Sequence, residues 1–404
     1  MTNQSTPKKN FQFPQVALLA LLMVCAVDIW LGLTHPLTKA VTPNLDRSET
    51  FSTACVYNEQ QQAPDVVLLG SSLMVAPVMQ AEALFLGRPF PRFEHRQSTF
   101  VSDLLSKSLG TNPNVFCFAV AGEAVSDAYL ITKHVLTGDK KPKAIVYGLA
   151  PRDFQDNTCP GIDSTEAFNV LSDLRDVKEV ASDNNFAFDR TANLALARIS
   201  SLWKYRNDIR SYATLRLKKS MERVLPWVVF DKYDQYGNLG PHKKGQYPEE
   251  AIGKIQAFPN VAMENAGNIK TIQQYIRRYR PENKSAVDQQ FEHLNKLIEL
   301  CRDNQIELLL VNMPLSKTNI DLLPDGFYKN YIDRLQKMCA QNNTQLLDLS
   351  ALYNGEESYT DTVHLKPEVS KEFLSTLVSE MSRSRAISAV KKTGVSLIKT
   401  QNAI

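Results

Sequence analysis

The stretch that decides the fold is "DVVLLGSSLMVAPV", Asp65 to Val78. A short apolar run rich in Val and Leu stops at a glycine, and two serines follow it. Continuous apolar runs of this length are typical of strands that are buried on both faces. Four similar runs occur further along the chain, each ending at a glycine or a polar turn. The five predicted strands are 66–70, 115–122, 144–151, 306–314 and 345–350.

Helix-like sequence separates these runs. Strands that alternate with helices imply right-handed crossovers and a parallel sheet. We therefore predict an α/β fold, a three-layer sandwich around a five-stranded parallel sheet. In such sheets ligands bind beyond the carboxyl ends of the strands, and Gly70-Ser71-Ser72 stands at such an end.

Charge and motifs exclude several classes of partner. The 404 residues include 46 Lys and Arg against 43 Asp and Glu, a formal net charge of +3. No long basic block occurs and acids are interleaved almost everywhere, so we predict no nucleic-acid partner. The sequence has neither a GxxxxGK phosphate loop nor an HExxH motif, and we predict no cofactor and no metal.

The six cysteines show neither a CxxC motif nor a spacing typical of metal ligands. Cys117 and Cys301 lie in apolar surroundings and are expected in the core. Cys55 and Cys159 are candidates for a disulfide in an oxidising compartment, which the sequence leaves open.

The N-terminus predicts a membrane anchor. Val16–Leu33 is an apolar run interrupted only by Asp28, close to the ~20 residues that cross a bilayer as a helix. Lys8 and Lys9 precede it, and no clean cleavage site follows. We predict a cytoplasmic segment at 1–14, an uncleaved signal anchor at 15–33 and a linker at 34–62. The rest of the chain is expected on the periplasmic or extracellular side of a bacterial plasma membrane.

The strand rhythm breaks between the third and fourth runs. We predict that the sheet domain is formed by 63–155 and 291–380, with a mostly helical insertion at 156–290. The insertion either shapes a site at the sheet edge or forms a second small domain unconnected with it. The basic segment 381–404 is expected either on an anionic membrane surface or as a solvated end.

One histidine stands out as a candidate base. A serine hydroxyl needs a base to take its proton, and the base needs a third group to orient it. Among the six histidines only His364 has a carboxylate three residues before it, Asp361. Both follow the last predicted strand. Because the ends of parallel strands share one rim of the sheet, the order Ser, Asp, His is compatible with one site.

These residues resemble the motifs of the SGNH (GDSL-like) hydrolase superfamily, over roughly 64–155 and 300–380. That resemblance implies a flavodoxin-like sandwich. The Gly-Asp-Ser block of the family corresponds to Gly70-Ser71-Ser72, with Ser72 as nucleophile. The second block, "FAVAGEAVSD", implies that the N–H of Gly122, with that of Ser72, lines an oxyanion hole. The last block, Asp-x-x-His, corresponds to Asp361 and His364.

The third block departs from the family. The usual Gly-x-Asn-Asp, whose asparagine donates to the oxyanion, is replaced by "YGLAPRDF". Loss of one such donor costs about 10²–10³ in rate. One hypothesis is that Arg152 supplies the missing hydrogen bond. The alternative is that Arg152 forms a salt bridge with Asp153 or Asp156.

A signal anchor joined to this domain resembles envelope proteins that transfer or remove acyl groups on polysaccharides, such as the O-acetylation proteins of alginate and the D-alanyl transfer proteins of teichoic acid. The chain also resembles an uncharacterised membrane-anchored family of cyanobacterial type. We predict a serine esterase or O-acyltransferase that acts on a polysaccharide or a small acylated molecule, with a membrane-embedded acyltransferase as a candidate partner. The alternative is an inactive domain that binds polysaccharide or assembles an envelope complex. In a third interpretation, the insertion docks a membrane-embedded partner.

Overall fold

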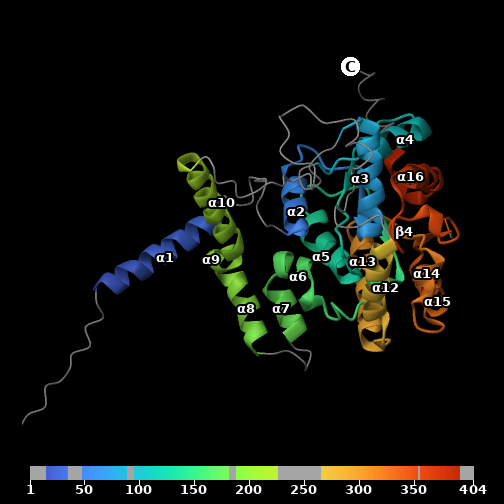
Figure 1. The fold of residues 1–404 in the computed structure, drawn as a ribbon. Helices are drawn as coiled ribbons and strands as arrows, with labels where there is room; N and C mark the ends of the chain where they lie inside the picture. Colours follow the sequence, from blue (N-terminus) through green and yellow to red (C-terminus); the bar gives the residue numbers. More distant parts are fainter. Residues whose placement is uncertain are drawn as a thin grey trace, which may run out of the picture. The chain divides into compact units, whose positions relative to one another are not determined.

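The computed structural model describes residues 15–34, 48–88, 95–181, 188–225, 265–353 and 355–391. All five predicted strands are present and form one parallel sheet (Figure 1). Their order, β2-β1-β3-β4-β5, is that of flavodoxin-like sandwiches, so the predicted α/β fold is confirmed. The strands are β1 (Val66–Gly70), β2 (Val115–Cys117), β3 (Ala144–Leu149), β4 (Glu307–Asn312) and β5 (Gln345–Asp348).

β2 is shorter than its apolar run. The strand ends at Cys117, although the run continues to Gly122. The next segment stays bonded to β1, with Phe118 N–H donating to the Leu68 carbonyl at 2.8 Å and Val120 N–H to the Gly70 carbonyl at 2.9 Å. The residues after β2 therefore follow the end of β1 toward the rim of the sheet.

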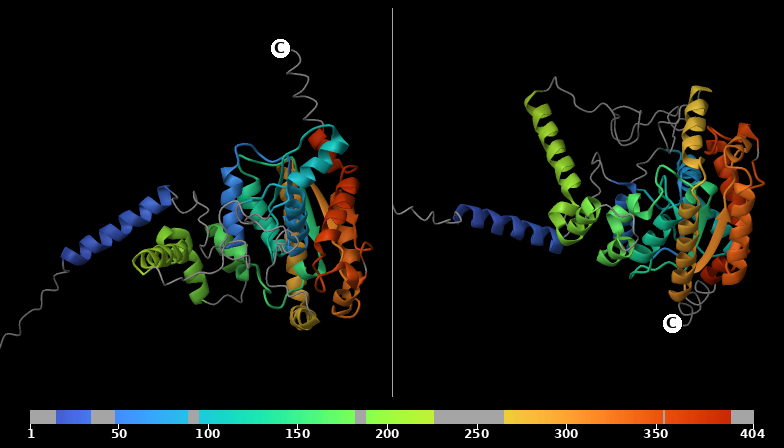
Figure 2. Two further views of the ribbon diagram at one scale, coloured as in Figure 1. Left: turned by 45° about the horizontal axis from the view of Figure 1, so that its top comes forward. Right: turned by 90° about the horizontal axis from the view of Figure 1, so that it is seen from below.

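Helices cover both faces of the sheet. On one face α3 (Ser72–Leu86), α4 (Thr99–Leu109) and α16 (Pro367–Met381) pack on one another (Figure 1 and Figure 2). Their apolar side chains join those of the strands in one buried core. On the opposite face lie α5 (Val125–Ile131), α13 (Lys284–Asp303) and α15 (Phe327–Asn342).

Nine further helices lie in the described residues. They are α1 (Gln15–Thr34), α2 (Glu49–Glu59), α6 (Glu166–Leu171), α7 (Leu174–Ala181), α8 (Phe188–Ile199), α9 (Ser201–Lys204), α10 (Arg206–Val224), α12 (Asn265–Tyr279) and α14 (Lys317–Asp321). Single turns occur at Thr132–Leu136, Pro151–Asp153, Ile162–Ser164 and Glu356–Ser358.

The chain divides into two compact units. One combines residues 1–40 with 173–217, and the other combines 41–172 with 218–404. The insertion predicted at 156–290 is thus shared between the two units. α12 and α13 belong to the unit that contains the sheet, because α13 packs on β4 and on α5.

The predicted basic tail begins inside the fold. Ala386, Ile387 and Val390 are buried in the core beneath α16. The backbone N–H of Arg385 donates to Gln345 Oε1 at 2.7 Å. The first part of this segment is therefore neither a solvated end nor membrane-bound, because apolar burial holds it. Residues 392–404, the polar stretch 231–250 and the N-terminal segment 1–14 lie outside the described residues.

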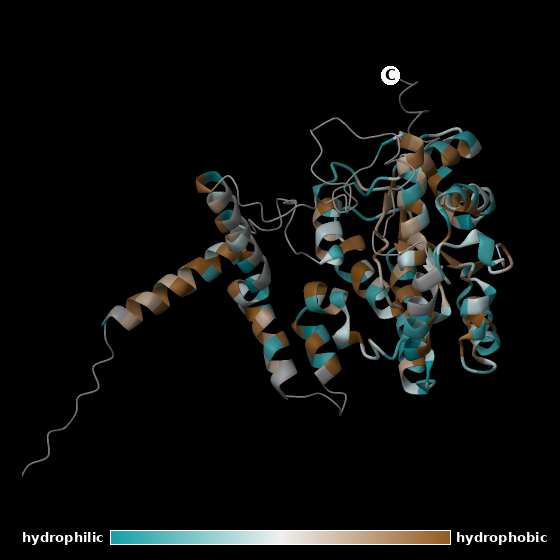
Figure 3. Cartoon of the chain, viewed as in Figure 1, coloured by the Kyte–Doolittle hydropathy of each residue, from teal (hydrophilic) through white to brown (hydrophobic). Residues whose placement is uncertain are grey.

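α1 is the one described helix that is long and apolar enough to cross a membrane, over Ala17–Thr34. Figure 3 shows hydrophobic residues along most of its length. A single N-terminal helix can therefore anchor the chain in a bilayer. None of the six cysteines, all in the described residues, forms a disulfide, so the candidate Cys55–Cys159 bond is not formed; Cys117 and Cys301 are buried as predicted.

Candidate active site

The candidate site lies at the point where the strand order reverses. From β1 the chain passes outward to β2, and it then returns to form β3 on the other side of β1. In open α/β sheets, ligands bind beyond the carboxyl ends of the strands at such a reversal. Ser71 and Ser72 follow β1 at this point, and the turn Pro151–Asp153 follows β3.

Gly70 makes the turn into α3 possible. Its φ is +140°, a conformation that side-chain-bearing residues rarely adopt, and a Cβ there would lie 2.8 Å from the carbonyl oxygen of Gly148. The chain can therefore pass directly from β1 into the first turn of α3. Ser72 is the first residue of that helix and is half-buried. In this turn the backbone N–H groups of Met74 and Val75 donate to the carbonyl of Ser71, the N-cap residue, at 3.0 and 3.1 Å.

Asp361 and His364 form a close pair. Asp361 Oδ2 lies 2.7 Å from His364 Nδ1. The other carboxylate oxygen accepts the backbone N–H groups of Val363 at 2.8 Å and His364 at 2.7 Å. Burial works against the charge of Asp361, but these bonds and the facing His364 hold its pKa below the usual value. The carboxylate is thus fixed as an anion that orients the imidazole.

Arg152 lies against the glycine of the second block. Gly122 has a φ of +81°, and a Cβ added to it would be 3.7 Å from Arg152 Nη2. Nη1 donates to the carbonyl of Glu123 at 2.9 Å, while Nη2 donates to Asp156 Oδ2 at 2.9 Å. The salt bridge with Asp156 exists, and it holds the guanidinium beside Gly122. The salt-bridge alternative is thus present, and the oxyanion role of Arg152 stays a prediction.

A small apolar cluster joins the segments that carry these residues. Ala150 and Val363 are buried together with Leu315, and Leu73 and Tyr275 pack against them. Leu73 follows Ser72 in the chain, Val363 precedes His364, and Ala150 opens the turn that holds Arg152. The segments that carry Ser72, Arg152 and His364 thus border one apolar cluster, against which Tyr275 also packs.

Sequence reasoning missed the contribution of α12. Tyr275 comes from this helix, and one turn later Arg278 lies 5.9 Å from its ring centre and also binds the Asp156 carboxylate. Burial raises the pKa of the Tyr275 hydroxyl to about 12, and the charges of Arg152 and Asp361 act on it. No motif marks these residues, because α12 is far from every block in the chain.

Three buried acids lie behind Gly122. Burial raises the pKa of Asp153 to about 7 and that of Asp127 to about 6. The pKa of Glu123 is raised well above its ordinary value by burial and by the neighbouring Asp127 and Asp153. Within the described part of the chain, neither carboxyl oxygen of Glu123 has a hydrogen-bond partner. Burial therefore favours the neutral form of the Glu123 carboxyl.

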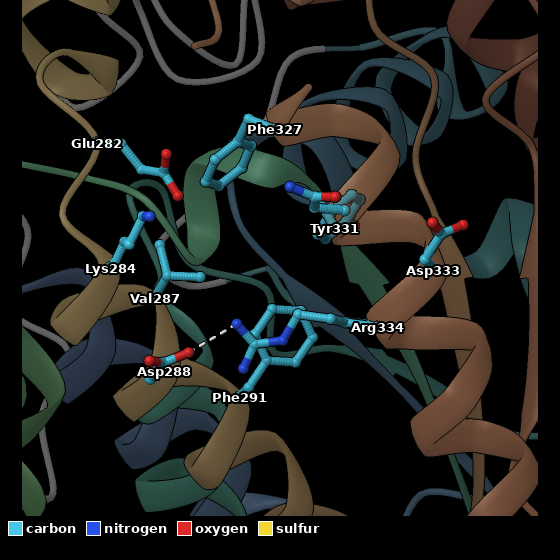
Figure 4. Close-up of a pocket in the computed structure, with 10 residues that line it drawn as sticks. Glu282, Lys284, Val287, Asp288, Phe291, Phe327, Tyr331, Asp333 and Arg334 are labelled. Carbon is cyan, nitrogen blue, oxygen red and sulfur yellow. Dashed lines mark hydrogen bonds and ion pairs between the residues drawn. The ribbon is translucent and has the colours of Figure 1, made fainter. Parts of the chain in front are cut away.

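A cavity of about 330 Å³ lies elsewhere, between α13 and α15 (Figure 4). Phe291, Phe327 and Tyr331 form its apolar wall. Arg334 lies 3.8 Å from the ring centre of Phe291 and binds Asp288 at 2.7 Å. None of the predicted site residues lines this cavity.

Comparisons with known proteins bear on the fold. A family model that carries no description matches residues 264–384, which include α12, α13, β4 and β5. No curated protein matches the chain. Among solved structures, the chain is similar to a carbohydrate esterase whose active site is described as displaying divergent catalytic and non-catalytic binding functions. The identity is 11% and the TM-score is 0.32, over 82% of this chain and 72% of that chain. A similarity of this extent carries no argument about function, and the fold assignment above rests on the strand order.

Proposed function

We propose that this protein is a membrane-anchored serine esterase or O-acyltransferase that works through an acyl-enzyme on Ser72. The observation that carries the proposal is the Asp361–His364 pair, 2.7 Å apart, whose neighbours in the chain pack with those of Ser72. Asp361 holds the proton on Nδ1 of the imidazole, which leaves Nε2 as the base.

In the first step Ser72 Oγ attacks the carbonyl carbon of an ester while His364 takes the hydroxyl proton. The tetrahedral intermediate then collapses, the C–O bond to the alcohol breaks, and His364 returns the proton to the departing oxygen. In the second step His364 deprotonates water or a sugar hydroxyl, which attacks the acyl-enzyme and releases Ser72. Asp361 stays ionised and stabilises the imidazolium in both steps.

The backbone N–H groups of Ser72 and Gly122 are the proposed oxyanion donors. Arg152 and Tyr275 are proposed to supply the positive field and the hydroxyl donor that the absent asparagine would have given. Support for this comes from the closeness of Arg152 to Gly122 and from the packing of Tyr275 and Leu73 against the same apolar cluster. The Asp156 carboxylate, shared by Arg152 and Arg278, would keep this side of the site rigid.

The proposed substrate is an acylated polysaccharide or a small acylated molecule at the outer face of a bacterial plasma membrane. Anchoring through α1 and the resemblance to envelope acyl-transfer proteins support this choice. A membrane-embedded acyltransferase is the proposed source of the acyl group if the acceptor is a sugar.

The test is labelling of the full chain with a fluorophosphonate, followed by peptide mapping. We expect labelling at Ser72, unchanged in Ser71→Ala and absent in Ser72→Ala. Ser71 is the matched control because it is the adjacent serine, is 3% exposed and bonds to the Asp153 carboxyl. Labelling that survives Ser72→Ala would contradict the proposed nucleophile.

A second candidate function is a polysaccharide-binding module without catalysis. It is favoured by the engagement of both Arg152 Nη atoms in internal bonds, which leaves fewer donors for an oxyanion. Folded protein that binds an acylated polysaccharide but does not react with the fluorophosphonate would select this alternative.

A further inference from the structure

The C-terminal part of α1 is held by contacts with α9. Asp28 Oδ1 accepts hydrogen bonds from the Ser200 hydroxyl at 2.9 Å and from the Leu202 backbone N–H at 2.6 Å. Gly32 lies so close that a Cβ there would be 2.9 Å from Ser201 Oγ, and Leu31 is buried. Residues 28, 31 and 32 share one face of the helix, so this face is covered by α9.

These contacts fix the depth at which α9 lies when α1 spans a bilayer. Asp28 is six residues before Thr34, where α1 ends, which corresponds to about 9 Å along the helix axis. That depth matches the headgroup and acyl boundary in which interfacial helices rest, about 5–10 Å. An aspartate inside an apolar span is costly unless it is paired, and the first turn of α9 satisfies it.

The helices beside these contacts expose apolar side chains. Leu196 and Ile199 on α8 and Leu217 on α10 are exposed, Ile199 by 71% and Leu217 by 62%. Trp203 on α9 is also exposed, and the guanidinium of Arg206 lies 4.9 Å from its ring centre. Tryptophan beside a cation is typical of the membrane–water interface.

The charge of the same segment suits an anionic surface. Between Asn193 and Leu217 the sequence has five Lys and Arg residues against one Asp. Of these cations, Lys204, Arg206, Arg210 and Arg216 are exposed. Two contributions stabilise a helix at a membrane interface: burial of apolar side chains and attraction of basic residues to anionic lipid. This segment has residues of both kinds.

We propose that residues 193–217 form an interfacial helical platform that docks on the lipid surface around α1. The bilayer itself covers the exposed apolar side chains, because the platform is hydrogen-bonded to α1, the helix that enters the bilayer. The platform binds headgroups of anionic phospholipids through its cations and the upper acyl chains through Leu196, Ile199 and Trp203. This proposal does not depend on the chemistry of Ser72.

The test is the fluorescence of Trp203 in the full chain, reconstituted in vesicles of three parts phosphatidylcholine to one part phosphatidylglycerol. Trp30→Phe and Trp227→Phe leave Trp203 as the only tryptophan. We expect lipids brominated near the headgroup end of the acyl chain to quench most of its emission, and deeply brominated lipids to quench less. Addition of Ile199→Glu should reduce the quenching, while Asn193→Gln, a polar and exposed control on α8, should not.

Circular dichroism first establishes that the variant is folded. The proposal is then overturned if brominated lipid leaves the Trp203 emission unchanged and aqueous acrylamide quenches it fully. Brominated lipid would also fail to quench Trp203 if the exposed apolar side chains bind a protein partner, because lipid alone would then not cover them. Quenching that persists in vesicles of phosphatidylcholine alone and is not weakened there would overturn the role given to the cations.

Discussion

Ser71 and Ser72 are adjacent in the chain, but their surroundings differ. Ser71 is buried and bonded to the Asp153 carboxyl, whereas Ser72 begins α3 and is half-buried. The sequence identified Ser72 through its place in the Gly-x-Ser block. The depth of each hydroxyl depends on the turn at Gly70, which is a feature of the backbone.

Tyr275→Phe should lower the turnover of p-nitrophenyl acetate by about 10-fold to 100-fold with a smaller change in KM. The phenol has a pKa of about 12, so it stays protonated and is a donor at pH 7. Loss of one oxyanion donor costs on the order of 10²–10³ in kcat, and a donor at the edge of the site costs less.

The matched control is Tyr279→Phe on the same helix, whose buried hydroxyl donates to Asn319 Oδ1 at 2.9 Å. We expect this variant to turn over the substrate at the rate of the wild type. Equal loss in both variants would indicate that the packing of α12, and not the Tyr275 hydroxyl, supports activity.

Asp153 predicts a pH dependence of stability. Its pKa is about 7 in the folded protein against an ordinary 3.8. The folded chain therefore holds a proton that the unfolded chain has lost between about pH 4 and about pH 7, and stability falls as pH rises through this window. Asp153→Asn removes this loss, so its free energy of unfolding relative to wild type should increase by on the order of a few kcal/mol from about pH 4 to about pH 8.

Urea unfolding at several pH values measures this difference. A free-energy difference between Asp153→Asn and wild type that is constant over the whole range would show that Asp153 titrates normally in the fold.

At the scale of the element, the end of β1 depends on one glycine. Gly70→Ala combines an unfavourable φ with a contact of 2.8 Å to backbone, and we expect a loss of about 3 kcal/mol or more. The control is Gly87→Ala at the end of α3, where φ is +64° but no atom lies within 4 Å. That variant should lose only about 1–2 kcal/mol. Equal losses, measured by urea unfolding, would mean that the contact with Gly148 relaxes freely.

At the scale of the whole molecule, α1 is the described helix that can anchor the protein in a bilayer. Leu22→Arg places a charge near the centre of the apolar span, which costs about 2.5–3.5 kcal/mol on insertion. We expect the variant to be partly extracted from membranes by alkaline carbonate, while wild type and Leu22→Ala remain in the pellet. Complete extraction of the wild type would contradict anchoring through α1.

The sheet, and the edge at which the candidate site lies, were predictable because apolar strands and polar turns alternate locally. The five runs and the Asp-x-x-His spacing are readable from short stretches of sequence. By contrast, β2 ended early and the segment after Met381 proved to pack in the core, because hydrogen bonding and burial depend on neighbours distant in the chain.

The sequence by itself determined the α/β class of the fold, the one N-terminal run apolar enough to cross a membrane and the residue types of the candidate triad, since each depends on periodicity or spacing within short stretches of the chain. Only the tertiary structure brought Tyr275 and Arg278 of α12 to Arg152, and α9 to Asp28. These contacts join segments more than 100 residues apart. Chain folding, and no local pattern, decides which of them meet.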